Sequence, residues 1–187
     1  MWTLREYAIV LFLVWVSIDG LVVSRRKSAN SEKRDHFSFQ LLMFCGLTAY
    51  IAGVYIAYTP YGHILPRVPI QIMGFIIMGI GIFIRTLAII QLGRFHTPKV
   101  AVLADHRVVS IGLYRYVRHP SYLGALIAYL GWSLALDNWL SLMIIMTLTT
   151  VAYLYRIHEE EAALCDALGD AYANYQHRTK RLIPGIF

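Results

Sequence analysis

The stretch VRHPSYLG, residues 117–124, marks the point at which a basic segment gives way to a strongly apolar one. A residue before proline is driven toward extended geometry, whereas proline suits the first turn of a helix, so His119 and Pro120 predict an abrupt helix start. The backbone N–H groups of residues 121–123 would lack acceptors within that helix. Together with Arg118 they could receive a carboxylate or a phosphate, although a helix start flanked by positive charges explains the same pattern.

The chain as a whole is too apolar for an ordinary soluble domain. Of its 187 residues, 58% are hydrophobic and 15% are charged, and the mean hydropathy is +0.54. Apolar segments of helical length lie at about 4–23, 39–59, 67–92, 121–136 and 139–155. They predict one all-α integral membrane domain over residues 1–187, with about five transmembrane helices and a cytosolic C-terminal helix. Only Asp137 and Asn138 separate the last two segments, so we expect a tight helical hairpin there.

The distribution of charge predicts how these helices cross the membrane. Lysine and arginine gather in the connections at 24–38 and 93–119, whereas the connections near residues 60–66 and 137–138 carry few basic residues. By the positive-inside rule the two basic connections and the C-terminus are cytosolic, and the N-terminus is outside. The first apolar segment has no small-residue cleavage site after it, so we expect a retained helix rather than a signal peptide. The net charge of +6 fits this topology and anionic lipid headgroups, and it requires no nucleic-acid partner.

Several common site patterns do not occur in the sequence. Cys45 and Cys165 suggest neither a disulfide framework nor a cysteine metal site. His158 precedes three glutamates, but HEEEA is not the HExxH pattern, and we expect no metal. Gly79 and Gly81 lie in an apolar helix with no strand before them, which indicates close helix packing rather than a nucleotide-binding loop. We therefore do not expect a soluble Rossmann-type methyltransferase.

A second polar cluster follows the last apolar segment. The sequence RIHEEEAAL, residues 156–164, places Arg156 and Glu160 four positions apart and so on one helix face. A solvated, ion-paired helix explains this pattern as well as a site does. Arg85 is a third polar feature, seven residues before the end of its segment and so about 10 Å inside it. It either snorkels to the interface or belongs to an internal polar site, and the sequence leaves both open.

These segments, taken in order, resemble the isoprenylcysteine carboxyl methyltransferases and their prokaryotic relatives. The series is HRVVSIGLYRYVRHPSYLG at 106–124, the apolar hairpin, RIHEEEAAL, YANY at 172–175 and LIP at 182–184. The resemblance covers roughly residues 94–187, which would be the cofactor-binding half. RHPxY alone is a weak signal, because lipid N-methyltransferases carry similar stretches, but the ordered series is specific.

The resemblance implies an integral membrane enzyme that uses S-adenosylmethionine, releases S-adenosylhomocysteine and has its site at the cytosolic face. The residues that it places at the cofactor are His106, Val108, Val109, Tyr114, His119, Pro120, Ser121, Tyr122 and Glu160. Arg156 would hold the acceptor and Arg85 would line the acceptor cavity, so Arg156, Glu160 and Arg85 are the candidate catalytic residues. The residue types suit this chemistry, because an acid matches the cationic groups of the cofactor and the planar fork of arginine can grip a carboxylate at two points.

Three functions remain open at this point. The first is carboxyl O-methylation of a lipophilic acid, such as a prenylated cysteine, that enters from the bilayer. The second is N-methylation of a phospholipid ethanolamine, which would share the cofactor site but needs an acidic or neutral cage around the acceptor. The third is a sterol-type membrane reductase or a non-catalytic membrane scaffold. Arg156 and Arg85 favour an anionic acceptor.

Overall fold

The computed structural model describes residues 2–25, 32–33, 37–96, 101–102 and 108–185. Within them lie the helices α1 (Leu4–Arg25), α2 (Phe37–Ala57), α3 (Arg67–Leu92), α4 (Pro120–Ala135), α5 (Trp139–Leu168) and α6 (Asp170–Arg178). Two short 3-10 helices, η1 (Gly93–Phe95) and η2 (Gly112–Arg115), flank the basic connection. Two-residue strands, β1 (Glu32–Lys33) and β2 (Ala101–Val102), pair antiparallel.

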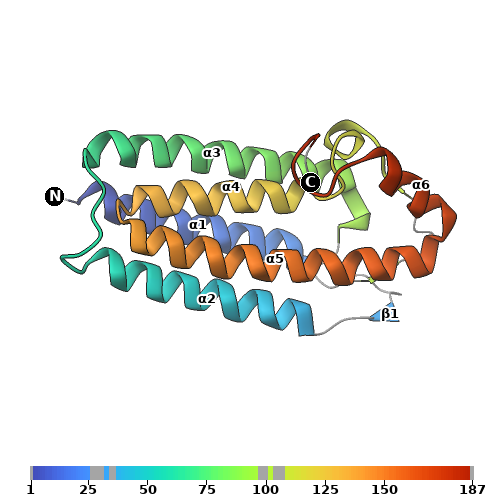
Figure 1. Cartoon of the computed structure of the whole chain (residues 1–187), viewed down its shortest axis with the longest axis horizontal. Coiled ribbons are helices and arrows are strands. Elements are labelled where there is room, and N and C mark those ends of the chain that lie inside the picture. The colour runs from blue at the N-terminus through green and yellow to red at the C-terminus, as the bar shows by residue number, and fades with distance from the viewer. Residues whose placement is uncertain (1, 26–31, 34–36, 97–100, 103–107, 186–187) are drawn as a thin grey trace.

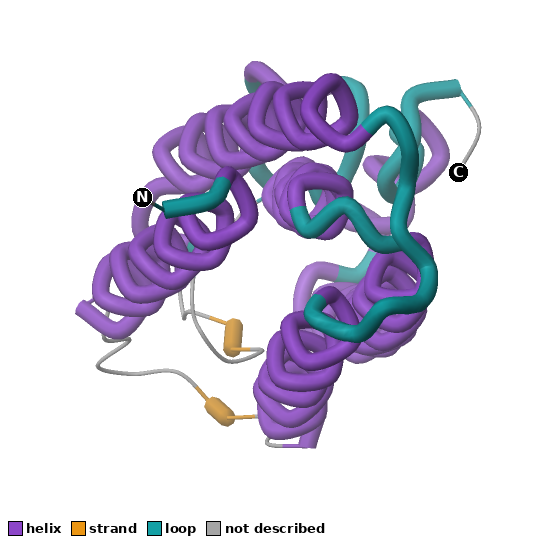
Figure 2. Tube along the Cα trace, turned by 90° about the vertical axis from the view of Figure 1, so that its left-hand side faces the viewer, coloured by secondary structure: helices purple, strands orange, loops and turns teal. Residues whose placement is uncertain are grey.

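The five long helices lie side by side in an elongated bundle, with α6 at one end and the N-terminus at the other (Figure 1). In a view along the bundle, one helix is surrounded by the others (Figure 2). That helix is α4, which contacts α1, α3 and α5, while α2 packs on α5. The expected all-α architecture is confirmed, and a helix occupies each of the five predicted apolar segments.

The last of these helices is much longer than its apolar segment. α5 continues from Trp139 to Leu168 and so carries the whole RIHEEEAAL sequence. Within the described residues, three helices are long and apolar enough to cross a membrane: α2, α3 and α5.

Glycine lets α3 and α4 approach very closely. A Cβ atom on Gly74 would lie 2.5 Å from the backbone N of Ala135, and one on Gly124 would lie 2.5 Å from the backbone N of Arg85. Gly81 faces α4 in the same way, which confirms the predicted close packing, but Gly79 meets nothing within 4 Å and the prediction is wrong there. This seam brings Arg85 directly against the start of α4.

A buried carboxylate fixes the opposite end of the bundle. Asp137, in the connection between α4 and α5, receives a hydrogen bond from Arg5 at 3.0 Å and one from Gln71 at 3.3 Å. Nδ1 of His63 lies 3.2 Å from its other oxygen. Asn138 begins α5 by accepting hydrogen bonds from two backbone N–H groups of its first turn. The hairpin is thereby tied to α1, to α3 and to the connection between α2 and α3.

Candidate active site

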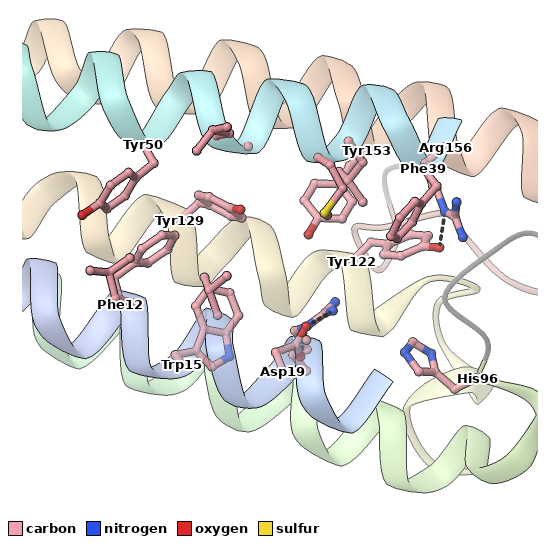
Figure 3. Close-up of a pocket in the computed structure, with 18 residues that line it drawn as sticks. Phe12, Trp15, Asp19, Phe39, Tyr50, His96, Tyr122, Tyr129, Tyr153 and Arg156 are labelled. Carbon is pink, nitrogen blue, oxygen red and sulfur yellow. Dashed lines mark hydrogen bonds and ion pairs between the residues drawn. The ribbon is translucent and has the colours of Figure 1, made fainter. Parts of the chain in front are cut away.

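A cavity of about 670 Å³ runs along the inside of the bundle, between α1 and α2 on one side and α4 and α5 on the other. Its walls are mostly apolar and aromatic, and Figure 3 shows Phe12, Tyr50 and Tyr129 toward one end. Toward the other end the lining becomes polar, with Asp19, Arg85, His96, Tyr122, Tyr153 and Arg156. An elongated apolar space with a charged end suits an amphiphilic ligand.

Arg85 belongs to an internal polar site rather than to the membrane interface. Its Nε donates to Oδ1 of Asp19 at 2.7 Å and its Nη2 donates to Oδ2 at 2.6 Å, so the pair is bidentate. Its Nη1 donates to the carbonyl of Ser121 at 3.2 Å. The side chain is buried and lines the cavity, which answers the question that the sequence left open.

Arg156 lies across the cavity and is linked to Glu160 through a phenol. Its Nε donates to the hydroxyl of Tyr122 at 3.3 Å, and its Nη1 donates to the hydroxyl of Ser38 at 3.1 Å. The Tyr122 hydroxyl in turn donates to Oε2 of Glu160 at 2.6 Å. The two charged residues that share a face of α5 are therefore joined by a hydroxyl from the first turn of α4. Figure 3 shows the Arg156–Tyr122 bond at the polar end of the cavity.

Glu161 connects the RHP sequence at residues 118–120 to the EEE sequence at residues 159–161. Its carboxylate accepts from Arg118 at 2.7 Å and from Arg181 at 2.8 Å, and Nε2 of His119 lies 3.3 Å away. Burial alone would raise the pKa of this carboxyl, which lies beyond the apolar part of α5, but the His119 and Arg118 hydrogen bonds outweigh burial and hold it at about 2. The carboxylate is thus ionised at neutral pH and anchors the segment before α4.

Arg118 does not take the place that the sequence suggested. Besides Glu161, it donates to the carbonyls of Gln176 and Thr179, so its guanidinium binds the C-terminal segment. The N–H groups of Tyr122 and Leu123 both point to the carbonyl of His119, at 3.1 Å each. Of the two explanations that the sequence left open, the structure favours the plain helix start, because Arg118 and the N–H groups of Tyr122 and Leu123 bond to the protein itself.

Tyr114 is the residue of this region whose polar group remains unsatisfied. Its hydroxyl is buried, and it has no hydrogen-bond partner within the described residues. Burial raises the pKa of this phenol, and the nearby Glu160 carboxylate raises it further, so the hydroxyl stays protonated. A buried hydroxyl without a partner is costly, which makes this position a candidate for contact with a ligand.

The other predicted site residues lie around this point or outside the described residues. His119, Pro120 and Ser121 are buried at the start of α4, and the His119 ring stacks on Tyr122 with centroids 5.5 Å apart. Val108 and Val109 are half-buried ahead of η2. His106 lies outside the described residues.

Sequence reasoning did not identify three residues that complete the site. Asp19 pairs with Arg85, Ser38 binds Arg156, and Glu161 holds the segment before α4. An acid inside an apolar segment is itself a signal, so Asp19 could have been found. Nothing in the sequence separates Glu161 from its two neighbouring glutamates, and Ser38 carries no signal.

A known protein family matches about half of this chain. A family model described as the isoprenylcysteine carboxyl methyltransferase family matches residues 72–166. The protein-S-isoprenylcysteine O-methyltransferase of Schizosaccharomyces pombe is 35% identical over 116 residues, which cover 61% of this chain and 48% of the relative. The enzyme of that name in Saccharomyces cerevisiae is 32% identical over 117 residues, covering 62% and 49%. This chain therefore spans about half the length of these curated relatives.

A solved structure also shares the fold. The structure of a eukaryotic intramembrane Ras methyltransferase, isoprenylcysteine carboxyl methyltransferase, matches with a TM-score of 0.59 and 24% identity. The match covers 77% of this chain and 52% of that one. Asp19 and Ser38 lie before the segment that the family model matches, whereas Arg85, Tyr122, Arg156 and Glu160 lie inside it.

Proposed function

Because this chain belongs to the isoprenylcysteine carboxyl methyltransferase family, we propose that it transfers a methyl group from S-adenosylmethionine to the carboxylate of a lipophilic acid, such as a prenylated cysteine. The observation that carries this proposal is the apolar cavity whose polar end holds Arg156 beside the Tyr122–Glu160 hydrogen bond. The names of the related yeast proteins support the same reaction.

The cavity suits a lipid tail that arrives from the bilayer. Leu13 and Val16 of α1 and Met43 and Leu47 of α2 line it, and all four are exposed on the outside of the bundle. The cavity therefore opens between α1 and α2, on a surface that hydrocarbon would cover in a membrane. An acceptor whose tail lies in the bilayer can enter sideways and leave its head group at the polar end.

Arg156 is the residue that we assign to the acceptor carboxylate. A carboxylate is already ionised at neutral pH, so its methylation requires alignment and partial exclusion of water more than a general base. The guanidinium fork can align a carboxylate at two points, and Ser38 and Tyr122 hold the arginine in place.

The residues on the far side of Tyr122 fit the cofactor. Tyr114 offers a buried hydroxyl without a partner, and Glu160 offers a carboxylate for cationic groups, with His119 and Ser121 beside them. When bound, S-adenosylmethionine supplies an electrophilic methyl group on a sulfonium. Tyr122 separates this region from the acceptor cavity and hydrogen-bonds both Arg156 and Glu160. Val108, Val109, Pro120 and His106 complete the proposed cofactor site.

An acid fits the cavity better than a phospholipid amine does. Among the described residues that line the cavity, Asp19 alone is acidic. Both of its carboxylate oxygens accept hydrogen bonds from Arg85, so it is not available to an ammonium group. The guanidinium of Arg156 would repel an amine that is protonated, whereas it attracts a carboxylate.

We infer five membrane crossings, with the N-terminus outside and the active site at the cytosolic face. Four exposed aromatic residues lie at helix ends that are far from α6: Trp2 before α1, Tyr58 and Tyr61 after α2, and Trp139 at the start of α5. These helix ends lie together at one end of the bundle (Figure 1), as expected of aromatic residues at a membrane interface. α4 has 16 residues, and so reaches about 24 Å across a hydrocarbon core of about 30 Å. The start of α4, which carries the proposed cofactor residues, therefore lies near the boundary between the hydrocarbon core and the cytosol.

A transfer assay tests the proposed function directly. Purified protein is given methyl-labelled S-adenosylmethionine with a prenylcysteine analogue, with a fatty acid, or with phosphatidylethanolamine. We expect label on the prenylcysteine analogue, released by mild base because a carboxyl methyl ester hydrolyses easily. Base-stable label on the phospholipid alone would show that the acceptor is an amine, and no transfer to any lipid would contradict the assignment as a methyltransferase.

A further inference from the structure

The polar end of the cavity contains two guanidinium groups, although the proposed reaction needs only one to align the acceptor. Arg85 from α3 and Arg156 from α5 both line it. A carboxylate that can pair with either arginine has two places to bind, and only one of them sets it correctly for transfer. Productive binding therefore requires that the carboxylate pairs with only one of the two guanidinium groups.

Asp19 of α1 occupies the binding edge of Arg85. The two parallel hydrogen bonds, at 2.7 and 2.6 Å, use the same fork that would otherwise grip an acceptor carboxylate. The remaining bond of Arg85, to the Ser121 carbonyl at 3.2 Å, turns the guanidinium toward α4. Arg156 has a different environment: two of its hydrogen bonds are to neutral hydroxyls, those of Tyr122 and Ser38.

We propose that Asp19 is a positioning residue for the acceptor: it fills the fork of Arg85, so that the acceptor carboxylate binds at Arg156 in a single arrangement. The inference rests on the proposed carboxyl methylation. Asp19 lies in the cavity wall, on α1 and before the segment that the family model matches.

The substitution Asp19→Asn tests the role of the charge while keeping the size of the side chain. An amide oxygen can accept from Arg85, but it no longer neutralises it, so Arg85 competes with Arg156 for the acceptor. Acceptor molecules bound at Arg85 do not react. Non-productive binding of this kind lowers kcat and KM by the same factor, on the order of tenfold for one such charge pair, and leaves kcat/KM unchanged.

Two further variants separate this effect from damage to the fold. In the double variant Asp19→Asn/Arg85→Gln, the competing cation is gone, so kcat and KM should both rise again from the values of the single variant. Asp137→Asn is the matched control, because Asp137 also ties α1 to the bundle, through Arg5, but at the other end. It should lower the Tm without the paired fall of kcat and KM.

A binding measurement gives a readout that does not depend on turnover. The probes are a prenylated thioether acid and its methyl ester, which differ only in charge. Asp19→Asn should bind the acid about tenfold more tightly than the unchanged protein does and the ester equally well. If the unchanged protein methylates only an amine lipid, the proposed function fails, while the acid-to-ester comparison still reports on Asp19.

The inference is overturned by either of two results. One is a loss of kcat/KM in Asp19→Asn that Arg85→Gln does not relieve and that Asp137→Asn reproduces, since Asp19 would then only hold α1 in place. The other is acid binding that is unchanged or weaker in Asp19→Asn, because Arg85 would then not compete for the acceptor.

Discussion

At the scale of single residues, Tyr122 holds the two charged groups of the site in one arrangement. Its hydroxyl accepts from Arg156 and donates to Glu160, so the proposed acceptor side and the proposed cofactor side share one phenol. A hydroxyl can act in both directions at once, whereas a carboxylate or a guanidinium cannot. The distance between the two sides is therefore set by the position of one residue in the first turn of α4.

The first prediction concerns Glu160. The change Glu160→Gln should weaken binding of S-adenosylmethionine by about 2 kcal/mol, or roughly thirtyfold in Kd, because it removes an anion that faces cationic groups in a partly dry site. Isothermal titration with S-adenosylmethionine, in the absence of an acceptor, measures the change. The matched control is Glu159→Gln, one position earlier on α5, which should bind normally. Equal Kd values for the Glu160 variant and the unchanged protein would refute the cofactor assignment.

The second prediction concerns Arg156. Arg156→Ala should leave cofactor affinity largely intact while turnover with the acid falls by about 100-fold or more, as expected when a group that aligns the reactant is lost. Arg156→Lys should recover little, because a point charge cannot hold a carboxylate at two points. Turnover at saturating cofactor is the measurement, with Arg178→Ala on the exposed face of α6 as control. Near-normal methylation by Arg156→Ala would exclude this mechanism.

The sequence predicted some of these residues and not others for clear physical reasons. Arg156 and Glu160 are four positions apart, and helical spacing alone places them on one face. The partner of Arg156, Ser38, is 118 positions away, and only the packing of α2 on α5 brings the two together. A serine at the start of an apolar helix has no property that distinguishes it from an ordinary helix start.

At the scale of elements, the seam between α3 and α4 sets the position of Arg85. The prediction is that Gly81→Leu destabilises the protein, because a Cβ there would lie 2.7 Å from the carbonyl of Gly124 and closer still to the backbone of Ala128. Overpacking of this kind costs about 1–3 kcal/mol, and more where backbone must move. Thermal unfolding in detergent measures the effect as a lower Tm.

Gly79→Leu is the matched control for this change. Gly79 lies on the same helix, two positions earlier, and meets nothing within 4 Å, so a leucine there should leave the Tm nearly unchanged. If the two variants unfold at the same temperature, the close approach of α3 and α4 is not what limits the space at Gly81. The sequence indicates close packing for both glycines. Which of the two faces α4 depends on the rotation of α3 about its axis, and only the structure gives this rotation.

Also at the scale of elements, the structure differs from the simplest interpretation of the three successive glutamates. Three successive glutamates usually mark a solvated helix face, and a solvated face was an adequate explanation here. In the structure α5 runs past the apolar segment as one helix, and its far end is covered by α6 and by the segment before α4. Glu161 is thereby buried against Arg118, which no local pattern could predict.

At the scale of the whole molecule, the two ends of the bundle differ in chemistry. The end with the N-terminus has exposed aromatic residues and the buried Asp137 network, whereas the other end has α6, the Arg118–Glu161 pair and the candidate site. The lysine and arginine counts in the connections, which depend on composition and not on packing, predict that the end with the candidate site is cytosolic. The resemblance to the methyltransferase family is confirmed by the family match.

The last prediction is that the two ends lie on opposite sides of the membrane. Single cysteines are placed at Ser28, Tyr61 and Arg178 in a protein in which Cys45 and Cys165 are replaced. Tyr61 is preferable to its neighbour His63, because His63 contacts Asp137, whereas the Tyr61 side chain is 73% exposed. In intact cells an impermeant thiol reagent should label Tyr61→Cys alone, and after lysis it should label all three.

Labelling of Ser28→Cys together with Tyr61→Cys would show that α2 does not cross the membrane. Labelling of Arg178→Cys with Tyr61→Cys would place the charged end of α5 outside, away from a cytosolic supply of cofactor, and would contradict the proposed position of the site.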